Sequence, residues 1–281
     1  MTSDREADTS HYLMEHAGEG ARLEDKTNPE DTIFQLRLAG LTSGATCVDA
    51  GAGTGAVARV MADIVGPEGF VHALDTSAAR ITEGTELATG HDNLTFVNGD
   101  ILSPPLQAES FDFVWCRFVL QHLAEPEPAV RSLVNLVRPG GKLVLGDLDG
   151  HGLRHHPMTT RMAAHLSRLN EALRGHQDPH MGRKLYHLAY RAGLSDLHVH
   201  VLPYHVYAGA APERALANWT KKLEVAKPHM LSAFGSSAEF DSFASEFLEM
   251  LSDPGVFTYS SLILLVGTKC DEPNSAPNRS D

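Results

Sequence analysis

A short glycine-rich stretch behind an apolar run carries the first chemical signal in this 281-residue chain. Gly51, Gly53 and Gly55 follow residues 45–48, which predict a buried strand, and apolar residues at helical spacing come next. Glycine in such a strand-to-helix turn tolerates positive φ and lets a ligand approach the backbone closely. The first N–H groups of the following helix favour a carboxylate or a phosphate. The turn is therefore predicted to bind the anionic group of a ligand.

The position of Asp49, two residues before the first glycine, narrows the class of ligand. The glycine spacing is one residue shorter than the G-x-G-x-x-G spacing of dinucleotide-binding turns. A carboxylate at this place repels a pyrophosphate but suits a ligand that carries an ammonium group beside its own carboxylate. S-adenosylmethionine carries such an amino-acid group and a sulfonium cation, so the turn favours it over a nicotinamide cofactor.

Two further aspartates stand at the carboxyl ends of the next predicted strands. Asp75 ends the strand 69–75, roughly twenty residues past the glycines, where an acid accepts hydrogen bonds from both hydroxyls of a ribose. Asp100 follows the strand 94–97, at the sheet edge where open α/β sheets bind ligands, and is placed to accept a hydrogen bond from an adenine amino group. Acids at three successive strand ends are a more specific signal than any one of them.

Strands and helices alternate up to residue 149, which predicts a doubly wound parallel sheet. After that point the chain is less regular, but residues 197–201 alternate like a strand and residues 259–266 form an apolar strand. We therefore predict a Rossmann-like α/β fold with a mostly parallel seven-stranded sheet and an antiparallel last strand.

Segments outside the sheet predict additional helices. Asn28 is the expected N-cap of a helix before the first strand, with Pro29 at its first position. A long stretch near the C-terminus predicts two amphipathic helices, the second starting at a capping box of Ser236 and Glu239. The expected divisions are an N-terminal helical cap at 1–41, the core at 42–207 and 255–270, a helical lid at 208–254 and a disordered tail at 271–281.

The composition limits the partners and the compartment. The formal net charge of −13 argues against a nucleic-acid groove, which needs a basic footprint. No apolar run is long enough to span a bilayer, so no membrane partner is expected. Cys47, Cys116 and Cys270 lie far apart and form no metal or disulfide pattern, which is typical of a reducing compartment. We expect a cytoplasmic protein that binds a small molecule, and the composition leaves a homodimer open.

The order of these motifs resembles that of the class I S-adenosylmethionine-dependent methyltransferases. The resemblance covers residues 42–149. Within the family, the chain is similar to the small-molecule branch, which includes the ubiquinone/menaquinone-type and natural-product enzymes. The stretches that carry it are 48–55, Leu74-Asp75-Thr76-Ser77, Asn98-Gly99-Asp100-Ile101, Phe111-Asp112, Cys116-Arg117, Gln121-His122-Leu123 and Arg138-Pro139-Gly140-Gly141-Lys142.

The resemblance implies a role for each matching position. The glycine turn would bind the methionine moiety, Asp75 the ribose, Asp100 and Ile101 the adenine, and the Cys116 carbonyl the amino group of S-adenosylmethionine. The expected cofactor-binding residues are Asp49, Gly51, Ala52, Gly53, Thr54, Gly55, Asp75, Thr76, Asp100, Ile101, Cys116, Arg117 and Gln121.

Catalytic candidates are histidines, because a methyl acceptor that must lose a proton needs a base and imidazole titrates near neutral pH. His122 follows the fourth strand, and His151, His155 and His156 follow the fifth, with His156 beside Pro157 favoured. A metal site is not expected, because these histidines have no acidic or cysteine partner at ligand spacing.

Three functions compete at this point. The first is a methyltransferase that acts on a small, largely apolar acceptor at oxygen or carbon, in secondary metabolism. An apolar pocket is suggested by two helical stripes, which comprise Trp219, Leu223 and Met230, and Phe240, Phe243 and Phe247. The second is a nicotinamide-dependent oxidoreductase, which the glycine spacing and Asp49 disfavour. The third is a non-catalytic cofactor-binding module.

Overall fold

The computed structural model describes residues 27–150, 153–174 and 176–270, together with Gly20, Arg22 and Glu24. The predictions for His151, for the tail 271–281 and for most of the segment before residue 27 lie outside the described residues. The chain divides into two compact units. Of the described residues, the sheet unit comprises those within 20–147, 182–200 and 263–270, and the helical unit comprises those within 148–181 and 201–262.

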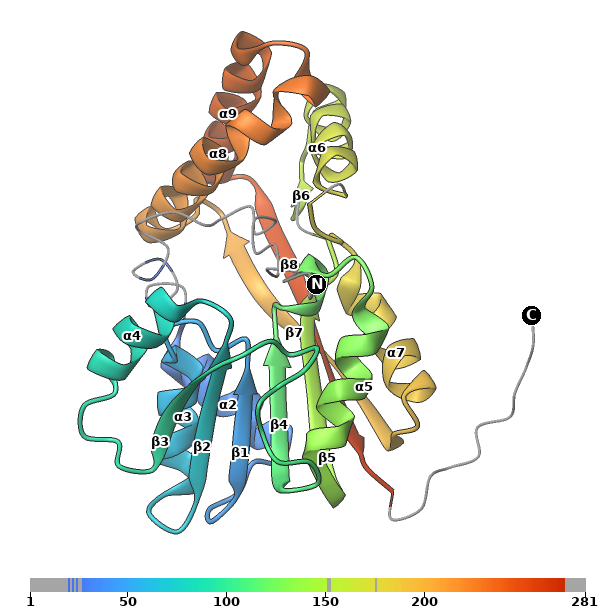
Figure 1. Ribbon diagram of the computed structural model, residues 1–281. Helices are drawn as coiled ribbons and strands as arrows, with labels where there is room; N and C mark the ends of the chain where they lie inside the picture. The colour runs from blue at the N-terminus through green and yellow to red at the C-terminus, as the bar shows by residue number, and fades with distance from the viewer. Residues whose placement is uncertain are drawn as a thin grey trace, which may run out of the picture. The chain divides into compact units, whose positions relative to one another are not determined.

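The strands form one sheet with the order β3-β2-β1-β4-β5-β8-β6, in which β7 pairs with β8 (Figure 1). Neighbouring strands from β3 to β5 are parallel, whereas β6 and β8 are antiparallel. The predicted doubly wound α/β fold is confirmed. The sheet has eight strands rather than seven because Arg154–His156, expected to be a loop, pairs with the start of β8. The bounds are β1 Thr46–Ala50, β2 Phe70–Asp75, β3 Leu94–Asn98, β4 Phe111–Arg117, β5 Val137–Leu148, β6 Arg154–His156, β7 Ser195–Ala208 and β8 Phe257–Thr268.

Helices on both faces cover the sheet unit, and Figure 1 shows α3 behind its strands and α5 in front. Their predicted starts are confirmed where a cap was expected. Asn28 Oδ1 accepts the N–H of Glu30 at 2.9 Å, and Ser77 Oγ accepts the N–H of Arg80 at 3.4 Å. The helices are α2 Pro29–Leu38, α3 Ala56–Val65, α4 Ala78–Leu87, α5 Pro126–Leu136 and α7 Leu185–Arg191, with 3₁₀ turns at Leu120–His122 and Met181–Lys184.

The register of the central strands brings three chain segments to one edge of the sheet. Ala50, the last residue of β1, pairs with Leu74 on one side and with Cys116 on the other. These three residues are buried, because both faces of the central strands are covered. The glycine turn, Asp75 and the segment after β4 therefore leave the sheet side by side.

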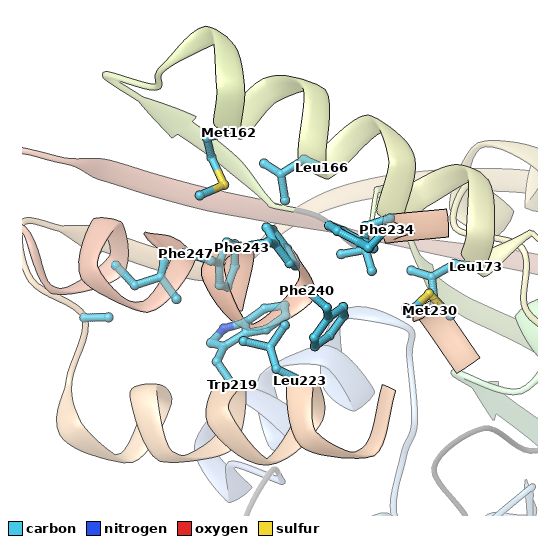
Figure 2. Close-up of a cluster of buried hydrophobic side chains, with 13 residues drawn as sticks. Met162, Leu166, Leu173, Trp219, Leu223, Met230, Phe234, Phe240, Phe243 and Phe247 are labelled. Carbon is cyan, nitrogen blue, oxygen red and sulfur yellow. The ribbon is translucent and has the colours of Figure 1, made fainter. Parts of the chain in front are cut away.

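The helical unit contains three helices that share an aromatic core: α6 Thr160–Leu173, α8 Glu213–Phe234 and α9 Ser237–Ser252. Figure 2 shows Trp219 and Leu223 of α8 facing Phe243 and Phe247 of α9, with Met162 of α6 beside them. The Trp219 and Phe247 rings meet edge to face with centroids 5.3 Å apart. The two amphipathic stripes predicted from the sequence are therefore buried core.

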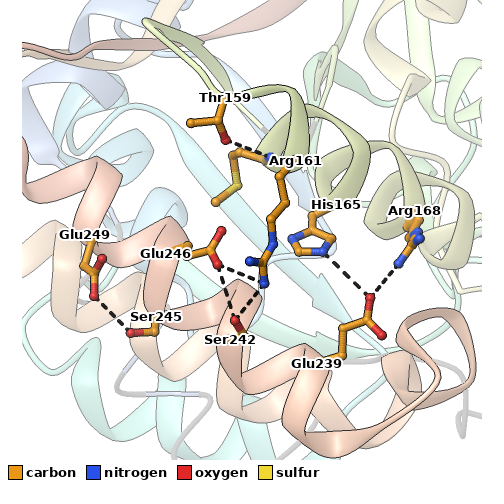
Figure 3. Close-up of polar contacts among 10 residues, drawn as sticks. Thr159, Arg161, His165, Arg168, Glu239, Ser242, Ser245, Glu246 and Glu249 are labelled. Carbon is orange, nitrogen blue, oxygen red and sulfur yellow. Dashed lines mark hydrogen bonds and ion pairs between the residues drawn. The ribbon is translucent and has the colours of Figure 1, made fainter.

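Polar contacts fix α6 against α9 along the rim of this core (Figure 3). Arg168 donates to Glu239 Oε1 at 2.9 Å, and Arg161 lies 3.0 Å from Glu246 Oε1. Ser236 caps α9 by accepting the N–H of Glu239 at 3.1 Å, so the capping-box start of this helix is confirmed.

Candidate functional site

The glycine turn after β1 has the backbone geometry that its sequence predicts. Gly51, Gly53 and Gly55 have φ values of 78°, 58° and 78°, in the left-handed region that glycine adopts without strain. A Cβ atom at Gly51 would collide with the side chain of Val119. The turn therefore needs glycine at position 51 for its φ and for the close approach of the segment after β4.

Most backbone N–H groups of the turn are already bonded within the sheet unit. Gly51 and Ala52 donate to the Leu74 carbonyl at 2.8 and 3.0 Å, and Gly53 donates to Asp75 Oδ2 at 2.8 Å. Gly55 is the N-cap of α3 and provides no side-chain cap. The N–H groups of Ala56 and Val57, at the start of α3, are therefore candidate donors for an anionic group.

Asp75 lies at the carboxyl end of β2 and bonds two backbone groups. Its Oδ2 accepts the N–H of Gly53, and its Oδ1 accepts the N–H of Ser77 at 2.9 Å. Each carboxylate oxygen has two acceptor sites, so both can still accept a hydroxyl hydrogen. The side chain is therefore fixed in place beside the glycine turn before any ligand binds.

Asp49 is buried with 4 % of its surface exposed, below the glycine turn. Burial raises the pKa of its carboxyl group to about 7, an effect that the nearby Arg117 guanidinium partly offsets. A backbone hydrogen bond from Ala58 stabilises the ionised form, but Oδ2 has no hydrogen-bond partner among the described residues. A buried carboxylate oxygen in this state favours a cationic ligand.

The segment after β4 is held by contacts with α2. Arg117 donates to Gln35 Oε1 at 2.6 Å, and its guanidinium lies 5.1 Å from the centroid of the Phe118 ring. Phe118 has a φ of 62°, which is strained for a side-chain-bearing residue. The strain turns the chain sharply and directs Val119 towards the glycine turn.

Gln121 supplies a second buried acceptor near this segment. Its backbone N–H donates to Asp147 Oδ2 at 3.2 Å, and its side-chain Nε2 donates to the Phe118 carbonyl at 3.3 Å. Its Oε1 is buried and accepts no hydrogen bond within the part of the chain that the structure describes. Asp49 Oδ2 and Gln121 Oε1 are thus two buried acceptors to which a ligand could donate, and an acceptor at Asp49 fits the ammonium group of S-adenosylmethionine.

The other predicted cofactor residues lie at the same edge of the sheet. Asp100 Oδ1 accepts the N–H of Leu102 at 2.9 Å, and Ile101 is buried. The Thr76 carbonyl accepts a hydrogen bond from Asn98 at 2.9 Å. Burial raises the pKa of the Cys116 thiol, so this group remains protonated.

The histidine candidates are divided between the two units. His122 belongs to the sheet unit, in the 3₁₀ turn after β4. His155 and His156 belong to the helical unit and face opposite sides of β6, as successive residues of a strand do. His155 Nδ1 lies 2.8 Å from Thr258 Oγ1 and its ring packs on Phe247, whereas His156 is exposed. A catalytic role for any of them stays a prediction.

Several residues at this edge were not found from the sequence. Val119, Phe118 and Gln35 have no motif of their own, and they reach the site only through the turn after β4 and the packing of α2. Asp147 is fully buried near the end of β5. Its position as an acid at the end of a predicted strand is the sequence signal that could have identified it. Glu24, which contacts Thr54, follows from no sequence pattern.

The described residues contain no helix that is long and apolar enough to cross a bilayer. They also contain no group of three or more His, Cys, Asp or Glu side chains that could bind a metal ion.

Comparison with known proteins identifies the domain that contains this site. Residues 48–145 match the family model of the methyltransferase domain. Over 115 residues the chain is 30% identical to the ubiquinone/menaquinone biosynthesis C-methyltransferase UbiE of Hahella chejuensis, and 32% identical to UbiE of Pseudomonas paraeruginosa. The alignment covers 40% of this chain and 46% or 45% of those proteins, so the chain spans less than half the length of the curated relatives it matches.

Solved structures share the fold at low sequence identity. Phosphoethanolamine N-methyltransferase 2 of Haemonchus contortus, in complex with phosphomonomethylethanolamine and S-adenosylhomocysteine, has a TM-score of 0.54 at 18% identity, over 86% of this chain and 53% of that one. The [4+2]-cyclase SpnF has a TM-score of 0.55 at 17% identity, over 86% and 81%. Residues 48–145 are therefore a methyltransferase domain, and the chain shares its fold with solved S-adenosylmethionine-dependent methyltransferases.

Proposed function

We propose that this protein transfers the methyl group of S-adenosylmethionine to a small, largely apolar organic acceptor, at oxygen or carbon. One observation carries the proposal: two buried acceptors, Asp49 Oδ2 and Gln121 Oε1, lack hydrogen-bond partners among the described residues beside a glycine turn. A cation suits these acceptors, whereas the pyrophosphate of a dinucleotide would be repelled by Asp49.

The residues of the sheet unit would hold the cofactor, which supplies an activated methyl group when it is bound. In this proposal the start of α3 binds the methionine carboxylate, and Asp49 with the Cys116 carbonyl binds the ammonium group. Asp75 accepts the ribose hydroxyls, and Asp100 with Ile101 binds the adenine. The contribution of the protein is mainly to orient the two reactants and to exclude water.

A largely apolar acceptor stays the proposal made from the sequence, and the aromatic side chains of α8 and α9 form the core of the helical unit. Carbon is a candidate target because the curated relatives are named C-methyltransferases, although the chain covers less than half of them. Secondary metabolism is proposed as the setting. A cytoplasmic location is supported by three free cysteines, and the net charge of −13 disfavours nucleic acid as a substrate.

A base is proposed for acceptors that must lose a proton, with His156, His151 and His122 as the candidates. His155, the remaining histidine candidate, has a hydroxyl partner at Nδ1 in Thr258, and such a partner orients an imidazole ring. An acceptor that reacts without losing a proton needs none of them, and orientation of the two reactants then accounts for the rate.

A second reaction class is favoured by one comparison. The [4+2]-cyclase SpnF has a similar fold, with a TM-score of 0.55. A fold alone therefore does not decide between methyl transfer and another reaction in a similar pocket.

The decisive experiment has two steps. Calorimetry should show that the protein binds S-adenosylhomocysteine and does not bind NAD, whereas tight binding of NAD alone would favour an oxidoreductase. The protein is then incubated with S-adenosylmethionine carrying an isotope-labelled methyl group and with pooled phenolic and other apolar metabolites. A labelled product identifies the acceptor and the methylated atom. Cofactor binding without any labelled product would favour a cyclase or a non-catalytic module.

A further inference from the structure

Glu24 connects the segment before α2 to the glycine turn. Its Oε1 accepts a hydrogen bond from Thr54 Oγ1 at 2.6 Å, and its Oε2 lies 2.5 Å from a guanidinium nitrogen of Arg59 on α3. Arg59 in turn donates to the Thr54 carbonyl at 3.0 Å. The three residues therefore form a closed ring in which each is bonded to the other two.

The ring is attached to the turn at a buried point. Thr54 is fully buried, and it lies between Gly53 and Gly55, both of which have positive φ. The Arg59 and Glu24 side chains expose 17% and 31% of their surface, so their ion pair is better shielded from water than a typical surface pair. Contacts to both the side chain and the carbonyl of Thr54 restrict the conformation of the turn.

A second contact places the same segment beside α4. A Cβ atom at Gly20 would collide with the Glu83 carboxylate, so the chain passes close to that helix. Phe96 packs against Gly55 and Gly84, which joins the turn to α4 from the sheet side. Gly20 and Glu24 thus lie against α4 and α3, the two helices that follow the candidate cofactor residues.

We propose that Glu24 is a positioning residue for the cofactor: through its bonds to Thr54 and Arg59 it holds the glycine turn in one conformation. This inference rests on the proposed function. If the ring fixes the turn in its binding conformation, cofactor affinity depends on Glu24 although Glu24 does not touch the cofactor. Coupling is reciprocal, so a bound cofactor must also stabilise the contacts of Glu24 with Thr54 and Arg59.

The test compares Glu24→Ala and Glu24→Gln with the wild-type protein. We expect Glu24→Ala to bind S-adenosylhomocysteine about tenfold more weakly, which is the effect of losing one charged hydrogen bond. Glu24→Gln keeps an acceptor for Thr54 but loses the ion pair with Arg59. Its affinity for S-adenosylhomocysteine should therefore lie between that of the wild type and that of Glu24→Ala. The matched control is Glu109→Gln, which removes a 2.9 Å ion pair with Lys269 elsewhere in the sheet unit and should leave the affinity unchanged.

Limited trypsin digestion provides a readout that a purely structural role would not move. S-adenosylhomocysteine should slow cleavage after Arg22 in the wild-type protein and should do so much less in Glu24→Ala. The melting temperature of each variant shows whether it is folded. If Glu24→Ala is unfolded, the affinity and protection measured for Glu24→Gln test the inference. The inference is overturned if the wild type binds S-adenosylhomocysteine and the Glu24 variants bind it equally well, or if protection at Arg22 is the same in all. Failure of the wild type to bind overturns the proposed function and this inference together.

Discussion

The backbone N–H of Gly53 donates a 2.8 Å hydrogen bond to Oδ2 of Asp75, which ties the end of β2 to the glycine turn. The same carboxylate is proposed to accept the ribose hydroxyls, so it both shapes the turn and contacts the ligand. Replacement of Asp75 by asparagine keeps the side-chain volume but removes the charge. We expect Asp75→Asn to weaken S-adenosylhomocysteine binding by about tenfold or more. Calorimetry with the exposed Asp92→Asn as control measures this, and unchanged affinity in both variants would refute the ribose assignment.

Asp49 should make cofactor affinity depend on pH. Burial raises its pKa to about 7, and only the ionised form attracts an ammonium group. The dissociation constant of S-adenosylhomocysteine should therefore fall as the pH rises through about 7. In Asp49→Asn the affinity should be weaker and nearly independent of pH over the same range. Titrations at several pH values measure this, and parallel curves for the two proteins would contradict it.

The same group should reduce the stability of the ligand-free protein as the pH rises. Between its ordinary pKa of 3.8 and its folded value of about 7, the folded state keeps a proton that the unfolded state has lost. The contribution of Asp49 to the free energy of unfolding therefore decreases across this interval and is constant outside it. The difference in stability between Asp49→Asn and the wild type, measured by urea denaturation, should shift in favour of the variant between those two pH values.

Gly51 and Gly44 form a matched pair for testing the tight turn. Both have positive φ, of 78° and 79°, but a Cβ atom at Gly44 has open space around it, whereas one at Gly51 meets Val119. Gly44→Ala should lower the free energy of unfolding by about 1 kcal/mol, from backbone strain alone. Gly51→Ala should cost more and should also abolish detectable S-adenosylhomocysteine binding. If both variants lose the same stability and bind S-adenosylhomocysteine normally, the close approach of Val119 to Gly51 is not needed for cofactor binding.

Trp219 tests the proposed role of the helical unit in acceptor binding. It is buried and packs edge to face on Phe247, so truncation to alanine would cost about 3–5 kcal/mol of stability. Trp219→Phe retains an aromatic ring and is the safer change. We expect it to raise the KM for the acceptor while leaving affinity for S-adenosylhomocysteine unchanged. The control is Phe240→Leu in the same core. A similar KM change in both variants would indicate a structural role only.

The histidine candidates can be separated by the pH dependence of kcat at saturating cofactor. A base should lower kcat by about a hundredfold when replaced by alanine and should remove the acidic limb of the profile. We expect this of one of His122, His151, His155 and His156. His198→Ala, an exposed histidine on β7, is the control. If all four variants keep kcat within a few-fold of the wild type, the reaction uses no histidine base.

The sequence by itself determined the local features of this protein, namely its turns, its helix caps and its secondary-structure elements. The glycine turn, the acids at the ends of the strands and the caps at Asn28 and Ser236 depend on residues a few positions apart, so they could be predicted without a structure. The spacing of apolar residues likewise predicted the strands of the parallel sheet and the buried stripes of α8 and α9. These features depend on backbone preference and on side-chain spacing within one element.

Only the tertiary structure decided which distant side chains meet. The bond from Arg117 to Gln35 joins residues 82 positions apart, and the bond from Thr54 to Glu24 joins residues 30 positions apart. The pairing of Arg154–His156 with β8 decided that His155 packs on Phe247 while His156 is exposed. The physical reason is that such contacts depend on how separate elements pack and on strand register, and no pattern within a single segment specifies either.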